Sequence, residues 1–279
     1  MEAVRAALGG RLAGDGPIGR RVEQRLATDL DAHRVLLTTS CTHAMELALL
    51  ALGIGPGHEV VCPSFTFVST ANAVLRVGAR PVFADIEDRT LGLDVEDVER
   101  RLTRRTAAVM PVHYTGVAPD MDGLLALSRD RGFKIVEDAA QALGARLQGR
   151  ALGTLGHAGC FSFHESKNIT CGEGGAVAIG DPELARRAEI IREKGTNRSA
   201  FLRGEVDKYT WVAEGSSFVL SDVLAAILEA QVDKLPEIDA RRAAVVARYR
   251  ADLGSWSSRT GVRLPPELPD REPNHHVFY

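Results

Sequence analysis

Short apolar runs alternate with longer helical patterns along most of this chain, and this alternation constrains the fold more than any other feature of the sequence. Each run has the length of a buried strand, and the segments between the runs have helical periodicity. Such alternation favours an α/β fold, a mostly parallel sheet with flanking helices. The predicted strands are 34–37, 59–62, 80–84, 107–112, 134–138, 160–163 and 176–179.

Between the strands, helices are predicted at 44–52 and 121–131. The pattern changes after Ile179, where the predicted helices are 181–194, 221–235 and 238–253. The helix at 221–235 begins at the capping residue Ser221 and stops at Pro236. A long polar loop is expected from Lys194 to about Trp211, and residues 274–279 have the pattern of a strand. We expect a large domain over 1–235 and the start of a smaller one over 236–279.

Composition excludes several classes of protein. With 279 residues, of which 45% are hydrophobic, the chain can bury a sizeable core, and the net charge of -3 gives no reason to expect nucleic acid as a partner. No apolar stretch could span a bilayer and no signal peptide is recognisable at the N-terminus, so we expect no membrane partner and a cytoplasmic location. The cysteines, at 41, 62, 160 and 171, lie in or beside apolar segments without a CxxC pair, which favours buried reduced thiols. No histidine has metal-ligand spacing, so no metal site is expected.

Lys167 and Asp138 carry the main chemical signal. Lys167 lies between an apolar run and the glycine-rich segment 172–175, where an amine could act as a nucleophile, although most lysines are merely solvated. Asp138 ends a predicted strand, and ligands bind at that end of parallel sheets. Its carboxylate could keep a pyridinium nitrogen protonated or simply cap the next turn. Together the two residues indicate a pyridoxal phosphate site, in which Gln141 could reach the phenolic oxygen of the ring.

Three further segments supply groups that could bind the same cofactor. Residues 38–43 place hydroxyls and backbone N–H groups at a helix N-terminus, where a phosphate binds readily, although an ordinary helix cap is the commoner arrangement. Ser162 could add a phosphate contact. Phe67 offers an aromatic ring for stacking, but phenylalanines spaced as Phe65 and Phe67 are more often core residues. His164 is either a packing residue or a group on the substrate side.

Taken in order, these motifs resemble the DegT/DnrJ/EryC1/StrS family of sugar-nucleotide aminotransferases. The resemblance covers essentially the whole chain, and it implies the aspartate aminotransferase-like fold, known as fold type I. The motifs that carry it are 39–42, 55–60, 63–67, 137–141, 161–164 with 167–168, and 172–176.

The resemblance implies a role for each site residue. Lys167 matches the Schiff-base lysine, Asp138 the partner of the pyridine nitrogen, and Gln141 the residue near the phenolic oxygen. Cys41, Thr42 and Ser162 match the phosphate contacts, and Phe67 matches the stacked aromatic residue. The resemblance also implies a homodimer with shared active sites, because an asparagine in many members reaches the phosphate of the neighbouring subunit. Ser217 stands at that place in this sequence.

Residues 192–198 and 203–211 resemble the members that form dTDP-4-amino-4,6-dideoxygalactose. This implies amino transfer from L-glutamate to dTDP-4-keto-6-deoxyglucose, for lipopolysaccharide or enterobacterial common antigen. Two alternatives remain. Some members are sugar dehydratases, but they have a histidine in place of the lysine, and Lys167 argues against that activity. Members usually begin earlier than Met1 and continue beyond Tyr279, so a truncated, non-catalytic homologue with an incomplete small domain is the second alternative.

Overall fold

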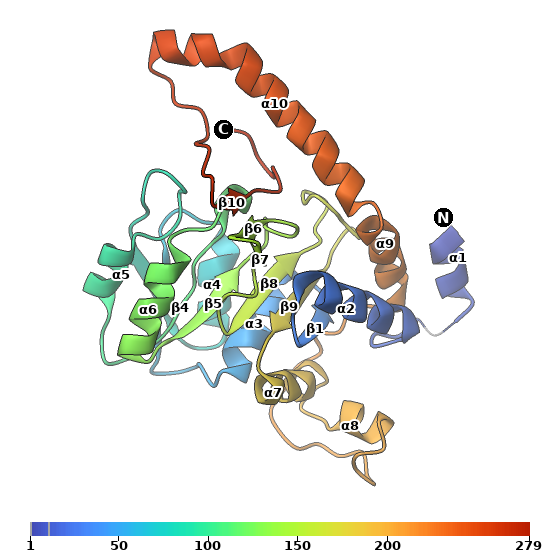
Figure 1. Ribbon diagram of the computed structural model, residues 1–279. Coiled ribbons are helices and arrows are strands. Elements are labelled where there is room, and N and C mark those ends of the chain that lie inside the picture. Colours follow the sequence, from blue (N-terminus) through green and yellow to red (C-terminus); the bar gives the residue numbers. More distant parts are fainter. Residues whose placement is uncertain (1, 11) are drawn as a thin grey trace.

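A seven-stranded sheet lies at the centre of the computed structural model, which describes residues 2–10 and 12–279 (Figure 1). Its order is β1-β9-β8-β5-β4-β2-β3. The strands are Arg34–Thr38 (β1), Glu59–Pro63 (β2), Arg80–Ala84 (β3), Thr106–Val109 (β4), Lys134–Asp138 (β5), Ala158–Ser162 (β8) and Gly175–Ile179 (β9). β9 runs antiparallel to its neighbours β1 and β8, and the other pairs are parallel. The predicted mostly parallel sheet is therefore confirmed.

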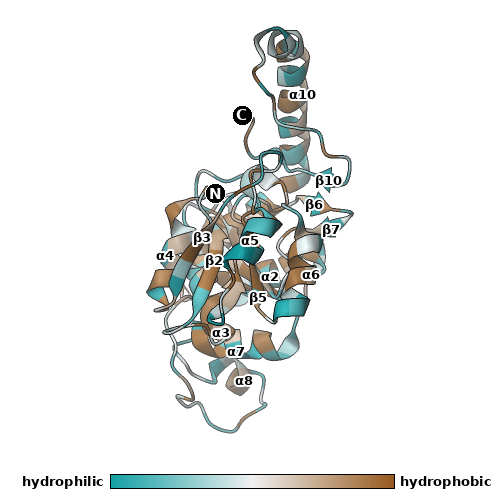
Figure 2. Ribbon diagram, turned by 90° about the vertical axis from the view of Figure 1, so that its left-hand side faces the viewer, coloured by the Kyte–Doolittle hydropathy of each residue, from teal (hydrophilic) through white to brown (hydrophobic). Residues whose placement is uncertain are grey.

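Helices cover both faces of the sheet, which explains why β2, β8 and β9 are buried along their whole length. One core contains Leu26, Leu124 and Leu228, and the other contains Leu47 and Val74. The first core lies under Pro17–Leu30 (α2), Met121–Arg131 (α6) and Asp222–Val232 (α9), and the second lies under Cys41–Ala51 (α3), Val68–Arg76 (α4) and Pro182–Arg192 (α7). In Figure 2 the strands are coloured mainly as hydrophobic, whereas Val95–Arg101 (α5) is coloured mainly as hydrophilic.

A long helix, Leu235–Thr260 (α10), projects from the body, and the chain then returns to it (Figures 1 and 2). None of its residues is buried. The returning chain forms Arg271–Glu272 (β10), which pairs with Arg146–Leu147 (β6) beside Arg150–Ala151 (β7). The remaining elements are Glu2–Leu8 (α1), the 3-10 turn Tyr114–Gly116 (η1) and Arg198–Leu202 (α8). Within the described ranges no helix combines the length and the apolar composition needed to cross a membrane.

The structure differs from the sequence-based prediction in the second half of the chain. Pro236 lies in the first turn of α10 and so begins a helix as well as following one, because the missing N–H of proline is not needed there. The expected polar loop contains the short helix α8. Residues 274–279 form no strand, since β10 ends at Glu272 and Pro273 has no N–H with which to continue the ladder.

Candidate active site

A cavity of about 480 Å³ opens at the carboxyl ends of β5 and β8. Its size is in the range of small-ligand sites, and its location is the one that open α/β sheets use for ligands. All of the predicted cofactor residues line this cavity: Cys41, Thr42, Phe67, Asp138, Gln141, Ser162 and Lys167. The fold therefore brings together side chains that are spread over more than 120 positions of the sequence.

Asp138 is the last residue of β5, and its side chain is almost completely buried. Oδ2 accepts a hydrogen bond of 2.7 Å from the hydroxyl of Thr70 on α4, and Thr70 is in turn 2.7 Å from the Thr66 hydroxyl. Burial raises the pKa of the Asp138 carboxyl, whereas the bonds from Thr70 and from the Ala140 N–H and the charge of Lys167 act in the opposite direction. Such a poorly hydrated carboxylate favours a cationic partner.

Glu137 faces away from Asp138, because successive side chains of a strand alternate in direction. It is fully buried, and four groups surround its carboxylate. Oε1 accepts from the N–H groups of Leu155 and Gly156, both at 2.6 Å, and Oε2 accepts from Gly153 N at 2.8 Å and lies 2.6 Å from Nε2 of His113. Glu137 thus binds the loop 153–156, while Asp138 lines the cavity.

The N-terminus of α3 forms another wall of the cavity. The hydroxyl of Ser40 accepts a hydrogen bond from His43 N at 3.1 Å, so the predicted helix cap is present. The N–H groups of Cys41 and Thr42 have no acceptor in the described part of the chain, and N–H groups at this position bind anions. Gly175 makes this arrangement possible, because a Cβ atom there would come within 2.5 Å of Cys41 N.

Gln141 is oriented by a backbone donor. The N–H of Thr115, a buried residue with a φ of 59°, donates to Oε1 of Gln141 at 2.7 Å. An N–H group can bond only to the oxygen of this amide, so the NH₂ group of Gln141 remains as a donor at the cavity wall. This is the group that a phenolic or phenolate oxygen would accept from.

Lys167 and Phe67 complete the cavity. The backbone N–H of Lys167 donates to the His164 carbonyl at 3.0 Å, which fixes the turn after β8 and leaves the side chain half-buried. The ring of Phe67 is 70% exposed, so Phe67 is not a core residue and its face can stack on a flat ligand. Phe65 instead packs against Tyr114, with ring centres 4.6 Å apart.

These groups fit pyridoxal phosphate. A poorly hydrated carboxylate suits a pyridinium nitrogen, a helix N-terminus with a nearby Ser162 hydroxyl suits a phosphate, and the Gln141 amide suits a phenolic oxygen. Lys167 supplies the amine. The same cavity contains residues that the sequence did not single out for this role, namely Thr66, Tyr114 and Glu173, while Thr70 and His113 lie behind it.

The structure places two residues, His164 and Ser217, whose roles the sequence left undecided. His164 lines the cavity, and its Nδ1 is 2.9 Å from the Ser166 hydroxyl, so it is a cavity residue and not a packing residue. Ser217 is exposed and is not among the residues that line the cavity.

The cysteines are free and buried, as predicted. Burial raises the pKa of Cys62 to about 12 and that of Cys171 to about 12, which keeps both thiols protonated and unreactive. In the described ranges, no group of three or more His, Cys, Asp or Glu side chains could hold a metal ion.

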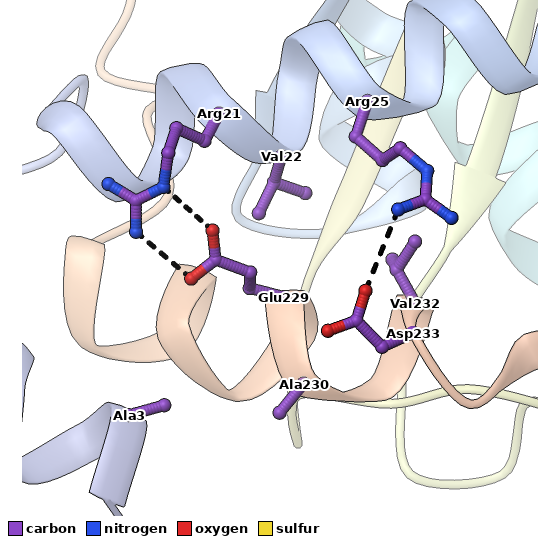
Figure 3. A pocket seen from close by; sticks show the side chains of 8 residues that line it. All are labelled: Ala3, Arg21, Val22, Arg25, Glu229, Ala230, Val232 and Asp233. Carbon is purple, nitrogen blue, oxygen red and sulfur yellow. Dashed lines mark hydrogen bonds and ion pairs between the residues drawn. The ribbon is translucent and has the colours of Figure 1, made fainter.

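A second hollow lies between α1, α2 and α9 (Figure 3). Its charged side chains are paired: Arg21 binds Glu229 at 2.8 Å, and Arg25 is 3.6 Å from Asp233. Because none of its described lining residues is an unpaired charge or a nucleophile, this hollow does not compete with the cavity at Lys167 as a catalytic site.

The sheet and its flanking helices have the fold of pyridoxal-phosphate-dependent aminotransferases. The chain belongs to the DegT/DnrJ/EryC1/StrS aminotransferase family, whose sequence pattern matches residues 1–279. Members of this family use pyridoxal phosphate, so the predicted cofactor is confirmed at the level of the family.

Solved structures similar to this chain include DesV of S. venezuelae, determined with a ketimine intermediate. It is 36% identical with a TM-score of 0.89, over 99% of this chain and 72% of DesV. The aminotransferase TlmJ from Streptoalloteichus hindustanus is 36% identical with a TM-score of 0.90, over 99% of this chain and 74% of its own. Spr1654 from Streptococcus pneumoniae, described as a sugar aminotransferase and solved in its PLP form, is 26% identical with a TM-score of 0.88, over 99% and 74% of the two chains.

Proposed function

We propose that this chain transfers the amino group of L-glutamate to a nucleotide-linked 4-keto-6-deoxy sugar with the help of pyridoxal phosphate. The observation that carries the proposal is the cavity at the ends of β5 and β8, which gathers an amine, a buried carboxylate and a helix N-terminus. The residues proposed to hold the cofactor are Cys41, Thr42, Phe67, Asp138, Gln141, Ser162 and Lys167.

Pyridoxal phosphate, when bound, supplies an electron sink for the charge that develops as a carbon loses its proton. We assign the movement of that proton to the amine of Lys167. A general base must lie within hydrogen-bond reach of the proton that it removes. The turn from His164 to Lys167 holds the amine at the cavity wall, next to the glycine-rich segment that packs on α3.

We assign Asp138 to the ring nitrogen, where its negative charge would keep that nitrogen protonated. Burial makes this charge costly without a cationic partner, and the hydroxyl of Thr70 fixes the orientation of the carboxylate. Cys41 and Thr42 would bind the phosphate through their N–H groups, and Phe67 would cover one face of the ring.

The proposed acceptor is dTDP-4-keto-6-deoxyglucose, which would make the product a dTDP-4-amino-4,6-dideoxygalactose for lipopolysaccharide or enterobacterial common antigen. This part rests on the resemblance of residues 192–198 and 203–211 to transaminases of that sugar. An assay with L-glutamate and a panel of nucleotide-linked 4-keto sugars, read by mass spectrometry of the products, tests it. If the assay gives a different aminated sugar, the proposed acceptor is wrong, but the proposed amino transfer still holds.

We further propose a homodimer with shared active sites. None of the residues that line the cavity comes from 192–217, and the aromatic side chains of Tyr209 and Trp211 are exposed in this segment. A second copy could place this segment, with Ser217, at the cavity of the first. Sedimentation velocity at micromolar concentration should give a dimer, and a monomer would exclude the sharing of sites.

We also propose that residues 1–235 form the large cofactor-binding domain and that 236–279 begin the smaller one. The start of the projecting helix α10 at Leu235 supports this boundary. A cytoplasmic location is proposed as well, because the four cysteines are free and disulfides are rare in that compartment.

Replacement of Lys167 tests the cofactor site directly. The protein mixed with pyridoxal phosphate should absorb visible light, and Lys167→Ala should abolish this absorbance because the amine is gone. Lys134→Ala is the matched control, since Lys134 is exposed at the start of β5. If the unmodified chain in excess cofactor shows no such absorbance, the proposal is contradicted. The alternative of a non-catalytic homologue then remains.

A further inference from the structure

Asn168, the residue after Lys167, connects the candidate site to the far end of the chain. Its Nδ2 donates to the carbonyl of Asn274 at 2.9 Å, and its Oδ1 lies 2.8 Å from Nδ1 of His276. Since an amide oxygen can only accept, His276 carries its hydrogen on Nδ1. Both ends of the Asn168 side chain are therefore bound to residues 274–276, which we call the 274–276 segment.

Asn274 connects the same segment to Gln141. Its side chain is 3% exposed, and Nδ2 donates to the carbonyls of Gln141 at 2.9 Å and Leu143 at 2.8 Å. Its Oδ1 is buried without a hydrogen-bond partner in the described chain and lies against Gly116, where a Cβ atom would come within 2.1 Å. A buried amide oxygen without a donor costs free energy, so the hydrogen bonds of Asn274 to Gln141 and Leu143 have to offset that cost.

The backbone of the 274–276 segment is held in an uncommon conformation. His275 has a φ of 53°, which is unfavourable for a residue with a Cβ atom. Arg242 on α10 stabilises this turn by donating from Nε to the His275 carbonyl at 3.0 Å and from Nη2 to the His276 carbonyl. The long helix thus anchors the segment that contacts the site.

The charges around His276 favour a fixed, neutral ring. Burial, together with the positive charges of Lys167 and Arg242, lowers the pKa of His276 to about 4. The imidazole is therefore uncharged near neutral pH and keeps the tautomer that donates to Asn168. Ser162, Lys167, Asn168, Asn274 and His276 border one small space behind the main cavity, so the contact between the segment and the site is continuous.

We propose that the 274–276 segment positions Lys167 and Gln141, with Asn168, Asn274 and His276 as the positioning residues. This positioning role rests on the proposed function, because the roles of Lys167 and Gln141 toward the cofactor come from it. It adds that residues beyond α10, in the part assigned to the small domain, belong to the cofactor site.

Two substitutions of one histidine separate the hydrogen bond from simple packing. His276→Leu keeps apolar volume but removes the donor to Asn168, whereas His276→Asn retains an N–H group near the position of Nδ1. His33→Leu is the matched control, because His33 is exposed before β1 and is not among the residues that border either cavity space. Circular dichroism and thermal unfolding of the cofactor-free variants would show that each one folds.

Two readouts follow for each variant of the full chain. The first is the affinity for pyridoxal phosphate and the pH midpoint of the visible absorbance. We expect His276→Leu to weaken the affinity about tenfold, as for the loss of one net hydrogen bond, and to shift the midpoint. The second is hydrogen exchange of the cofactor-free protein, which should become faster at residues 139–145 and 164–171. His276→Asn and His33→Leu should stay close to the unmodified chain in both readouts.

The outcomes are distinct. Unchanged absorbance and exchange in His276→Leu would overturn the positioning role, and so would an equal defect in His276→Asn. If the unmodified chain takes up no cofactor, the proposed function fails, and the exchange data alone then decide the positioning role. Faster exchange at 164–171 in His276→Leu but not in His276→Asn supports it even then, and unchanged exchange overturns it.

Discussion

At the scale of single residues, two adjacent carboxylates on β5 have opposite surroundings. Glu137 is fully buried but accepts from three backbone N–H groups and contacts His113, so its charge is well compensated. Asp138 is almost as deeply buried, yet within the described residues its donors are only the Thr70 hydroxyl and the Ala140 N–H. The acid that we assign to the cofactor ring is therefore the one whose charge the fold compensates less.

This difference predicts opposite effects of Asp138→Asn on stability and on function. Burial raises the pKa of Asp138 in the folded chain, so the unfolded state loses its proton first and stability falls as the pH rises above about 4. Without cofactor, Asp138→Asn should raise the Tm at pH 8 by roughly 2–4 °C, as about 1 kcal/mol would in a chain of this size. The gain should disappear toward pH 4.

The same substitution should slow amino transfer by a factor on the order of 10²–10³, since an oriented charge at the reacting ring is lost. Scanning calorimetry at several pH values and a single-turnover assay measure the two effects. Asp130→Asn is the matched control, because Asp130 is an exposed carboxylate on α6 and does not line the cavity. A lower Tm at pH 8 for Asp138→Asn would contradict the assignment of a destabilising buried charge.

At the scale of elements, the site depends on a close approach between β9 and α3. β9 begins at Gly175, which pairs with Ser162 of β8 and with Thr38 of β1. The backbone of Ser40 and Cys41 at the start of α3 fills the space where a side chain would stand. Glycine is therefore required at position 175, because the backbones of β9 and α3 are in contact there.

Gly175→Ala tests this contact. A Cβ atom would lie 2.3 Å from the carbonyl carbon of Ser40, so the helix must shift, at a cost of about 1–3 kcal/mol for overpacking. The shift should also weaken the binding of inorganic phosphate and of the cofactor. Gly180→Ala, at the open end of the same strand with nothing within 4 Å, should leave both unchanged. Urea unfolding and phosphate titration measure the two effects, and equal behaviour of the two variants would refute the packing argument.

At the scale of the whole molecule, one buried arginine joins the N-terminal segment and the first strand to α7. Arg192 at the end of α7 is 1% exposed and forms ion pairs with Glu23 on α2 and with Asp15, and it donates to the carbonyl of Leu37 on β1. Arg198 reaches Asp15 from α8. The N-terminal segment, the sheet and the polar region after α7 therefore share one ionic cluster.

Arg192→Met should lower the free energy of unfolding by about 3–5 kcal/mol, because it leaves the buried carboxylate of Glu23 without its cation, while Asp15 keeps its ion pair with Arg198. Arg186→Met on the same helix removes an exposed ion pair with Glu183 and should change stability by less than about 0.5 kcal/mol. Equilibrium unfolding in urea provides both values. A small effect of Arg192→Met would show that the cluster does not hold these segments together.

The sequence by itself predicted the strands of the central sheet and the main side chains that line the candidate cavity. Apolar runs, a helix cap at Ser40 and a lysine before a glycine-rich turn are local patterns, and local patterns can be recognised without knowledge of the fold. The bounds of β3 and β5 are those predicted. Because parallel strands deliver their carboxyl ends to one edge, Asp138 and Ser162 could also be expected to meet.

Only the tertiary structure decided which distant residues support that site. Thr70 and Asp138 are 68 positions apart, Asn168 and Asn274 are 106 apart, and Gln141 and Asn274 are 133 apart. No local pattern encodes such pairs, since they depend on how helices and returning segments pack on the sheet. The 274–276 segment has the composition of a strand, but its position is set by a turn at His275 and by hydrogen bonds to Asn168 and Arg242. Long-range packing therefore overrode local propensity there.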